Sequence, residues 1–100
     1  MLVLNNNPKF ELGRTVMTQG IAMKMDTNPQ FNVDVAIAFQ KYCNADWSEM
    51  KYEEDRQMNE EAVKNGNERI FATYNTCEGQ IYIITEHDRR YTTILFPDEY

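Results

Sequence analysis

Apolar residues recur at three- and four-residue steps over residues 29–43, which is the spacing of one face of an α-helix. Asn28 and Pro29 precede this run. Asn can accept backbone N–H groups at a helix start, and Pro at the first helical position loses no needed donor. We therefore expect the main core helix at 29–43, after a shorter helix at 19–25 that Thr18 can cap.

Residues 46–65 predict a third helical segment with a narrow apolar stripe. Asp46 followed by Glu49 has the spacing of a capping box, and we expect a short turn at 46–50 before the main helix at 52–65. Gly66 can take the left-handed conformation that ends a helix.

Alternating apolar residues at 10–17 predict a first strand, with a bulge or a close backbone approach at Gly13. Three further runs rich in β-branched and aromatic residues predict strands at 69–76, 80–86 and 91–96. Because short turns join these three runs, we expect a meander of two hairpins with 80–86 in the centre.

The helices precede most of the strands in blocks, which indicates an α+β fold. We expect two to three helices on one face of a small, mainly antiparallel sheet. The chain of 100 residues supports one core. We assign residues 1–9, which contain the polar stretch Asn5–Pro8, to a flexible arm and residues 10–100 to a single α+β domain.

The formal net charge of −6 disfavours direct binding to nucleic acid or to an anionic membrane. No apolar run approaches the roughly 20 residues of a membrane helix, and residues 1–8 do not resemble a secretion signal. Cys43 and Cys77 share no motif and are interpreted as buried thiols, with a disulfide as the alternative. These features predict a cytoplasmic protein.

The acidic block at residues 46–61 carries a net charge of −5, which is most of the charge of the chain. A solvated helix face is the ordinary interpretation, and a docking surface for a basic protein is the sharper one. Helix 46–65 contains no histidine for a carboxylate metal site, and we expect no cofactor. The candidate interaction surface comprises Asp46, Trp47, Glu49, Glu53, Glu54, Asp55, Glu60 and Glu61.

A second polar cluster surrounds the connection between the last two strands. An acid beside the only histidine suggests general acid–base chemistry, but a polar run between strands is typical of an exposed hairpin. No serine-hydrolase elbow and no glycine-rich phosphate loop is present, so we expect no catalytic residue. The cluster comprises Arg14, Glu86, His87, Asp88 and Arg89.

Several short motifs resemble a family of small, uncharacterised bacterial proteins carried on plasmids and integrating mobile elements. The resemblance rests on Phe10–Val16, Asp46-Trp47, Glu53–Asp55, Ile84–Arg89 with Thr93, and Pro97–Tyr100. It implies a setting in mobile DNA and no reaction. The residues shared with that family, which would mark a surface or an internal polar network, are Arg14, Asp46, Trp47, Asp88 and Arg89.

These observations favour a non-enzymatic accessory or regulatory protein that acts on an unidentified protein partner. One alternative is an inhibitor of a host defence enzyme whose acidic helix imitates nucleic-acid phosphate. Another is a small enzyme or nucleotide-handling domain that uses the hairpin at 85–90. A homodimer is a third, formed by an exposed strand edge at 10–17 or 91–96.

Overall fold

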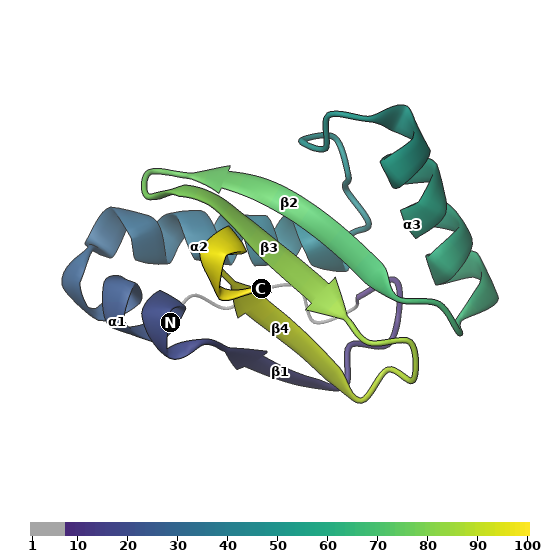
Figure 1. Cartoon of the computed structure of the whole chain (residues 1–100), viewed down its shortest axis with the longest axis horizontal. Helices are drawn as coiled ribbons and strands as arrows, with labels where there is room; N and C mark the ends of the chain where they lie inside the picture. The colour runs from purple at the N-terminus through teal and green to yellow at the C-terminus, as the bar shows by residue number, and fades with distance from the viewer. Residues whose placement is uncertain (1–7) are drawn as a thin grey trace.

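The structure is a computed structural model that describes residues 8–100, and it contains three helices and four strands (Figure 1). In chain order the elements are β1 (Arg14–Met17), α1 (Gln19–Thr27), α2 (Pro29–Cys43), α3 (Glu53–Asn65), β2 (Ile70–Thr76), β3 (Gly79–Thr85), β4 (Tyr91–Leu95) and the 3-10 turn η1 (Pro97–Glu99).

The four strands form one sheet in the order β1-β4-β3-β2. Strands β2, β3 and β4 form the expected antiparallel meander, with β3 as its central strand. Strand β1 pairs with β4 in parallel, so the sheet is mixed. Strand β4 is therefore interior, and the expectation that 91–96 offers an open edge is wrong. The outer strands are β1 and β2.

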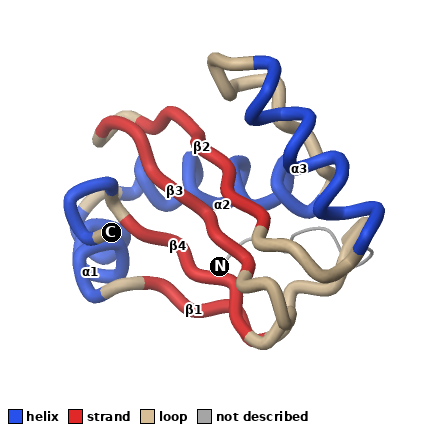
Figure 2. The backbone as a smooth tube through the Cα atoms, turned by 45° about the vertical axis from the view of Figure 1, so that its right-hand side comes forward, coloured by secondary structure: helices blue, strands red, loops and turns tan. Residues whose placement is uncertain are grey.

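Helices α1 and α2 cover one face of the sheet, while η1 lies over β3 on the opposite face (Figures 1 and 2). Helix α3 contacts the outer strand β2 at the edge of the sheet, apart from the other two helices. The α+β class is confirmed, with two helices on one face and the third at an edge.

Helix α2 spans the predicted residues and begins as its sequence indicates. The side chain of Asn28 accepts a hydrogen bond from the backbone N–H of Phe31 at 3.1 Å. Thr18 accepts from Ile21 at the start of α1. The buried face of α2 includes Phe31 and Tyr42, and burial of such a side chain contributes about 1.5–3 kcal/mol.

The first strand is shorter than expected, because pairing with β4 begins only at Arg14. Gly13 makes the expected close approach: its φ is 66°, and a Cβ atom there would lie 2.2 Å from the carbonyl oxygen of Arg89. Of the expected arm, residues 1–7 lie outside the described part of the chain, and Lys9 donates its N–H to Cys43.

The two cysteines have different environments, and both are free thiols. Cys43 is buried, and burial raises its pKa to about 11. Cys77 is exposed in the turn between β2 and β3, so the interpretation of both as buried thiols is wrong for this residue.

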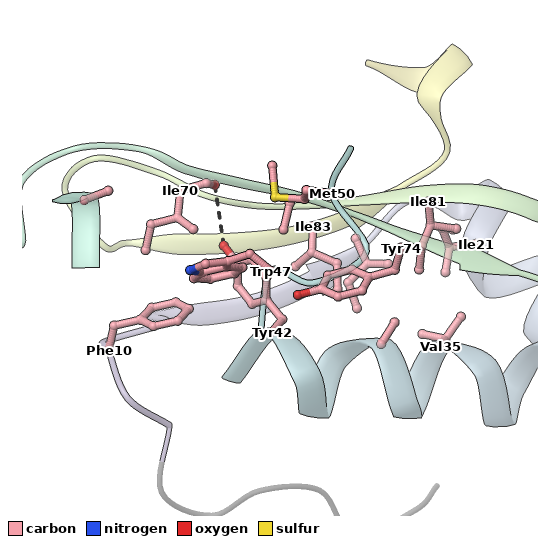
Figure 3. Packing of buried hydrophobic residues seen from close by; sticks show 14 of the residues in the cluster. Phe10, Ile21, Val35, Tyr42, Trp47, Met50, Ile70, Tyr74, Ile81 and Ile83 are labelled. Carbon is pink, nitrogen blue, oxygen red and sulfur yellow. Dashed lines mark hydrogen bonds between the residues drawn. The ribbon is translucent and has the colours of Figure 1, made fainter. Parts of the chain in front are cut away.

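Three aromatic rings fill one end of the core between the sheet and α2 (Figure 3). The ring of Tyr42 lies 5.3 Å from that of Phe10 and 5.6 Å from that of Trp47, both edge to face. Trp47 is only 4 % exposed. This residue of the candidate interaction surface is therefore a core anchor and cannot contact a partner.

A chain of buried hydroxyl groups connects α2 to the sheet and to the segment before β1. The Tyr42 hydroxyl lies 2.6 Å from that of Thr85, which lies 2.8 Å from that of Thr92. Thr92 in turn donates to the carbonyl oxygen of Leu12. Burial raises the pKa of Tyr42, so its hydroxyl stays protonated as the chain requires.

We predict that Tyr42→Phe lowers the free energy of unfolding by about 1–2 kcal/mol, because it removes one of the two buried partners of the Thr85 hydroxyl. Urea denaturation measures this change. The matched control is Tyr91→Phe, which removes a hydroxyl from an exposed side chain. Equal stability of the two variants would contradict a structural role for the hydroxyl chain.

Candidate functional site

The acidic block divides into acids that are bonded within the fold and acids on α3 that are exposed. Asp46 accepts hydrogen bonds from the hydroxyl and the N–H of Ser48, which lower its pKa. This arrangement helps to close the short turn expected at the start of the segment, in which the N–H of Met50 also donates to the carbonyl oxygen of Trp47 at 3.0 Å. Helix α3 begins after Tyr52, without a side-chain cap.

Glu49 is also occupied within the fold. One carboxylate oxygen lies 2.8 Å from the Lys41 ammonium group, and the other accepts from the N–H of Asn75 on β2 at 2.9 Å. The hydrogen bond to Glu49 raises the pKa of Lys41. Asp46 and Glu49 are therefore structural groups, and neither is free to bind a partner.

The remaining acids of the block lie on α3 and are exposed. The seven-residue steps from Glu53 to Glu60 and from Glu54 to Glu61 place these four side chains on one face of the helix. No hydrogen bond or ion pair engages their carboxylates within residues 8–100. Asp55 lies on another side of α3 and lines a cavity. We call the first four residues the acidic face.

A single buried side chain attaches the middle of α3 to the edge of β2. The amide group of Asn59 donates to the carbonyl oxygen of Phe71 at 2.8 Å and accepts from its N–H at 3.2 Å. These two bonds replace the backbone hydrogen bonds that a neighbouring strand would make with Phe71. Together with the Glu49 contact, it occupies backbone groups at the free edge of β2.

The end of α3 is held by Arg89, which is 7 % exposed. Its guanidinium donates to the carbonyl oxygen of Ala62 in the last turn of α3, at 2.9 Å, and to that of Glu68 in the following loop. It also donates to the carbonyl oxygen of Glu86 at 3.1 Å. A cation at a helix C-terminus is favoured by the helix dipole.

The other residues of the second polar cluster do not converge on a common point. His87 is exposed, and Asp88 accepts from the N–H of Arg90 two residues further on. The backbone N–H of Arg14 donates to the carbonyl oxygen of Arg90, and the Arg14 side chain is exposed. Arg89 turns away from all three into the interior. The geometry gives no support to the hypothesis of a hairpin active site.

A cavity of about 650 Å³ lies between α3 and the outer face of the sheet. Three aromatic side chains form its floor: Phe71 from β2, Tyr82 from β3 and Tyr100 after η1. The Phe71 and Tyr82 ring centroids are 4.7 Å apart, and Tyr100 meets both rings edge to face at about 6 Å. We call this cavity the α3 groove.

Charged side chains line the rim of the α3 groove, namely Asp55, Glu61, Glu68 and Arg69. The guanidinium carbon of Arg69 lies 5.7 Å from the centroid of Phe71 and 5.5 Å from that of Tyr100. Its Nη2 atom donates to the Tyr100 hydroxyl at 2.6 Å. The aromatic floor therefore already accepts one guanidinium group, and the rim keeps an excess of negative charge.

Glu99 fixes the C-terminal residues that carry Tyr100. Its carboxylate accepts from the Thr18 hydroxyl at 2.7 Å and from the N–H of Phe96 at 2.9 Å. Both hydrogen bonds lower the pKa of Glu99, and the bond from Thr18 has the larger effect. A Cβ at Gly20 would lie 2.3 Å from this carboxylate, so glycine makes room for the contact.

The sequence interpretation missed the aromatic floor of the α3 groove. A usable signal was present, because residues 70–72 and 81–84 are apolar at successive positions. Strands that face solvent on one side alternate between apolar and polar residues, whereas strands covered on both sides do not. That pattern indicated a second apolar sheet face, on which Phe71 and Tyr82 lie.

Comparison with known proteins found no matching family model, no matching curated protein and no matching solved structure. The resemblance to proteins of mobile elements therefore stays a prediction. Within residues 8–100, no group of three or more His, Cys, Asp or Glu side chains is arranged to hold a metal ion. In the same part of the chain, no helix is long and apolar enough to cross a membrane.

We predict that Arg89→Ala lowers the free energy of unfolding by about 3 kcal/mol, because several carbonyl groups, including the buried one of Ala62, lose a charged donor. Chemical denaturation measures the loss, and amide hydrogen exchange should increase most in α3. Arg90→Ala is the control, since that side chain is exposed and its one ion pair among residues 8–100 is with Asp88. A similar small change in both variants would refute the anchoring role of Arg89.

We further predict that the contact made by Glu99 weakens in acid. Its pKa in the folded chain is below the ordinary value of 4.5, so the unfolded chain binds the proton more tightly. The stabilisation is complete above the unfolded pKa and is lost as pH falls through the folded pKa. Glu99→Gln should flatten the pH dependence of stability in that acid range.

The control for this measurement is Asp98→Asn, which removes a neighbouring carboxylate that makes no side-chain hydrogen bond within residues 8–100. NMR titration of the Glu99 carboxyl carbon gives its pKa directly. An unchanged acid slope in the Glu99 variant would show that this carboxylate does not stabilise the C-terminal turn.

Proposed function

We propose that this protein is a non-enzymatic interaction domain that binds a basic protein partner on the side of the molecule where α3 lies. The observation that carries the proposal is the acidic face. Four carboxylates share one side of a helix, and no cation within residues 8–100 engages them.

The ion pairs in the rest of the fold support binding of a basic partner at α3. The ion pairs between described residues join Lys24 to Glu78, Lys41 to Glu49 and Arg90 to Asp88. None of these ion pairs includes a residue of α3, so the carboxylates of the helix direct their negative potential to solvent. Such a field speeds the encounter with a basic surface and adds less to final affinity.

The attachment of α3 also suits a presenting role. Its buried residues are Asn59 and Ala62, so most of the helix surface is available for contact. An accessory or regulatory role in a mobile element remains the setting that the sequence resemblance suggests. Two free thiols suit a reducing compartment such as the cytoplasm.

The test compares two variants that lose the same charge. Glu53→Gln, Glu54→Gln and Glu60→Gln together neutralise most of the acidic face. The control combines Glu11→Gln, Asp26→Asn and Asp98→Asn, which neutralise three exposed acids elsewhere. Binding of a fluorescent peptide of alternating lysine and glycine is measured by anisotropy at low and at physiological salt.

We expect the acidic-face variant to bind about fivefold more weakly than the native chain at low salt, and the control to change less than about twofold. The difference should shrink as salt screens the charges. Equal losses in the two variants would show that only net charge matters, and would remove the acidic face as the working surface.

A further inference from the structure

The α3 groove has a chemical character that the acidic face does not share. Its floor is aromatic, and two of its rim carboxylates, those of Asp55 and Glu61, make no hydrogen bond or ion pair within residues 8–100. Negative charge beside aromatic rings is the combination that attracts an organic cation. The rim carboxylates attract any cation, so the kind of cation that binds best depends on the aromatic floor.

The contacts of Arg69 show which cation the floor prefers. Its guanidinium lies over Phe71 and Tyr100 without a carboxylate partner in the described part of the chain. A planar guanidinium can stack on a ring and present a fork of donors to a carboxylate, whereas a lysine ammonium group does neither as well. Tyr82 carries no cation of its own among the described contacts.

From this geometry we propose that the α3 groove seats an arginine side chain from a basic segment of a partner protein. The guanidinium stacks on the aromatic floor at Tyr82, and Asp55 and Glu61 accept its hydrogen bonds. This proposal rests on the proposed function and names the residue type that the partner presents.

The size of the α3 groove fits a side chain together with part of its backbone. About 650 Å³ lies within the usual range of ligand-binding cavities and exceeds the needs of one guanidinium group. Met50 and Met58 line the same cavity. Their unbranched side chains can adjust to the methylene groups of an arginine stem.

The experiment uses two acetylated and amidated peptides, Gly-Arg-Gly-Arg-Gly and Gly-Lys-Gly-Lys-Gly, which carry the same charge. Each is titrated into the ¹⁵N-labelled full chain at low salt, and dissociation constants come from the amide shifts. We expect the arginine peptide to bind about threefold or more tightly than the lysine peptide. Its largest shifts should fall on Phe71, Tyr82 and Tyr100.

Two single variants of equal charge separate the groove from the acidic face. Asp55→Asn changes only the rim, because Glu61 belongs to both surfaces, and Glu53→Gln changes only the face. We expect the rim variant to weaken the arginine peptide about tenfold and the face variant about threefold, because direct hydrogen bonds are lost only at the rim. The lysine peptide should respond alike to both variants.

Tyr82→Leu supplies an independent test of stacking, since it keeps an apolar side chain and removes the ring. It should erase the preference for arginine over lysine while thermal unfolding stays cooperative. Equal affinities for the two peptides, or equal losses in the rim and face variants, would overturn the groove proposal and leave the acidic face standing. Absence of binding by both peptides at low salt would overturn both proposals.

Discussion

The buried guanidinium of Arg89 is the contact on which the arrangement of this molecule depends. It connects the last turn of α3, the loop before β2 and its own hairpin through carbonyl oxygens of all three. The left-handed backbone at Arg89, with φ of 61°, directs the side chain inward. Because carbonyl dipoles rather than carboxylates balance this charge, the fold buries a cation without consuming an acid.

Polar anchors of this kind explain why α3 lies at the edge of the sheet. A helix that packs by a broad apolar stripe lies flat on a sheet face, as α2 does. Helix α3 buries little besides Asn59 and Ala62, and Asn59 binds a strand edge rather than a face. One result is protection of β2 from pairing with another chain. The other is space for a cavity beside the outer sheet face.

The sequence predicted the elements whose pattern is local and periodic. Residues 29–43 form α2 as expected, since the apolar steps and the Asn28 cap agree. The place of β1 was not predictable, because its parallel pairing with β4 depends on contacts such as that between Leu12 and Thr92, 80 residues apart. For the site, the sequence located the negative charge, but only the fold shows that Asp46 and Glu49 are bonded to other groups of the same chain.

The two arginines beside α3 have different roles: Arg89 is buried and structural, whereas Arg69 is exposed on aromatic rings. Arg89 is enclosed by backbone oxygens, and its removal takes a charged donor away from each of them. Arg69 is exposed on aromatic rings and makes one hydrogen bond to a hydroxyl that water can replace. A second guanidinium could share or exchange the position of Arg69 at small cost, whereas the position of Arg89 is closed. Arg89 is therefore a structural residue, whereas the aromatic surface beside Arg69 is suited to a second guanidinium group.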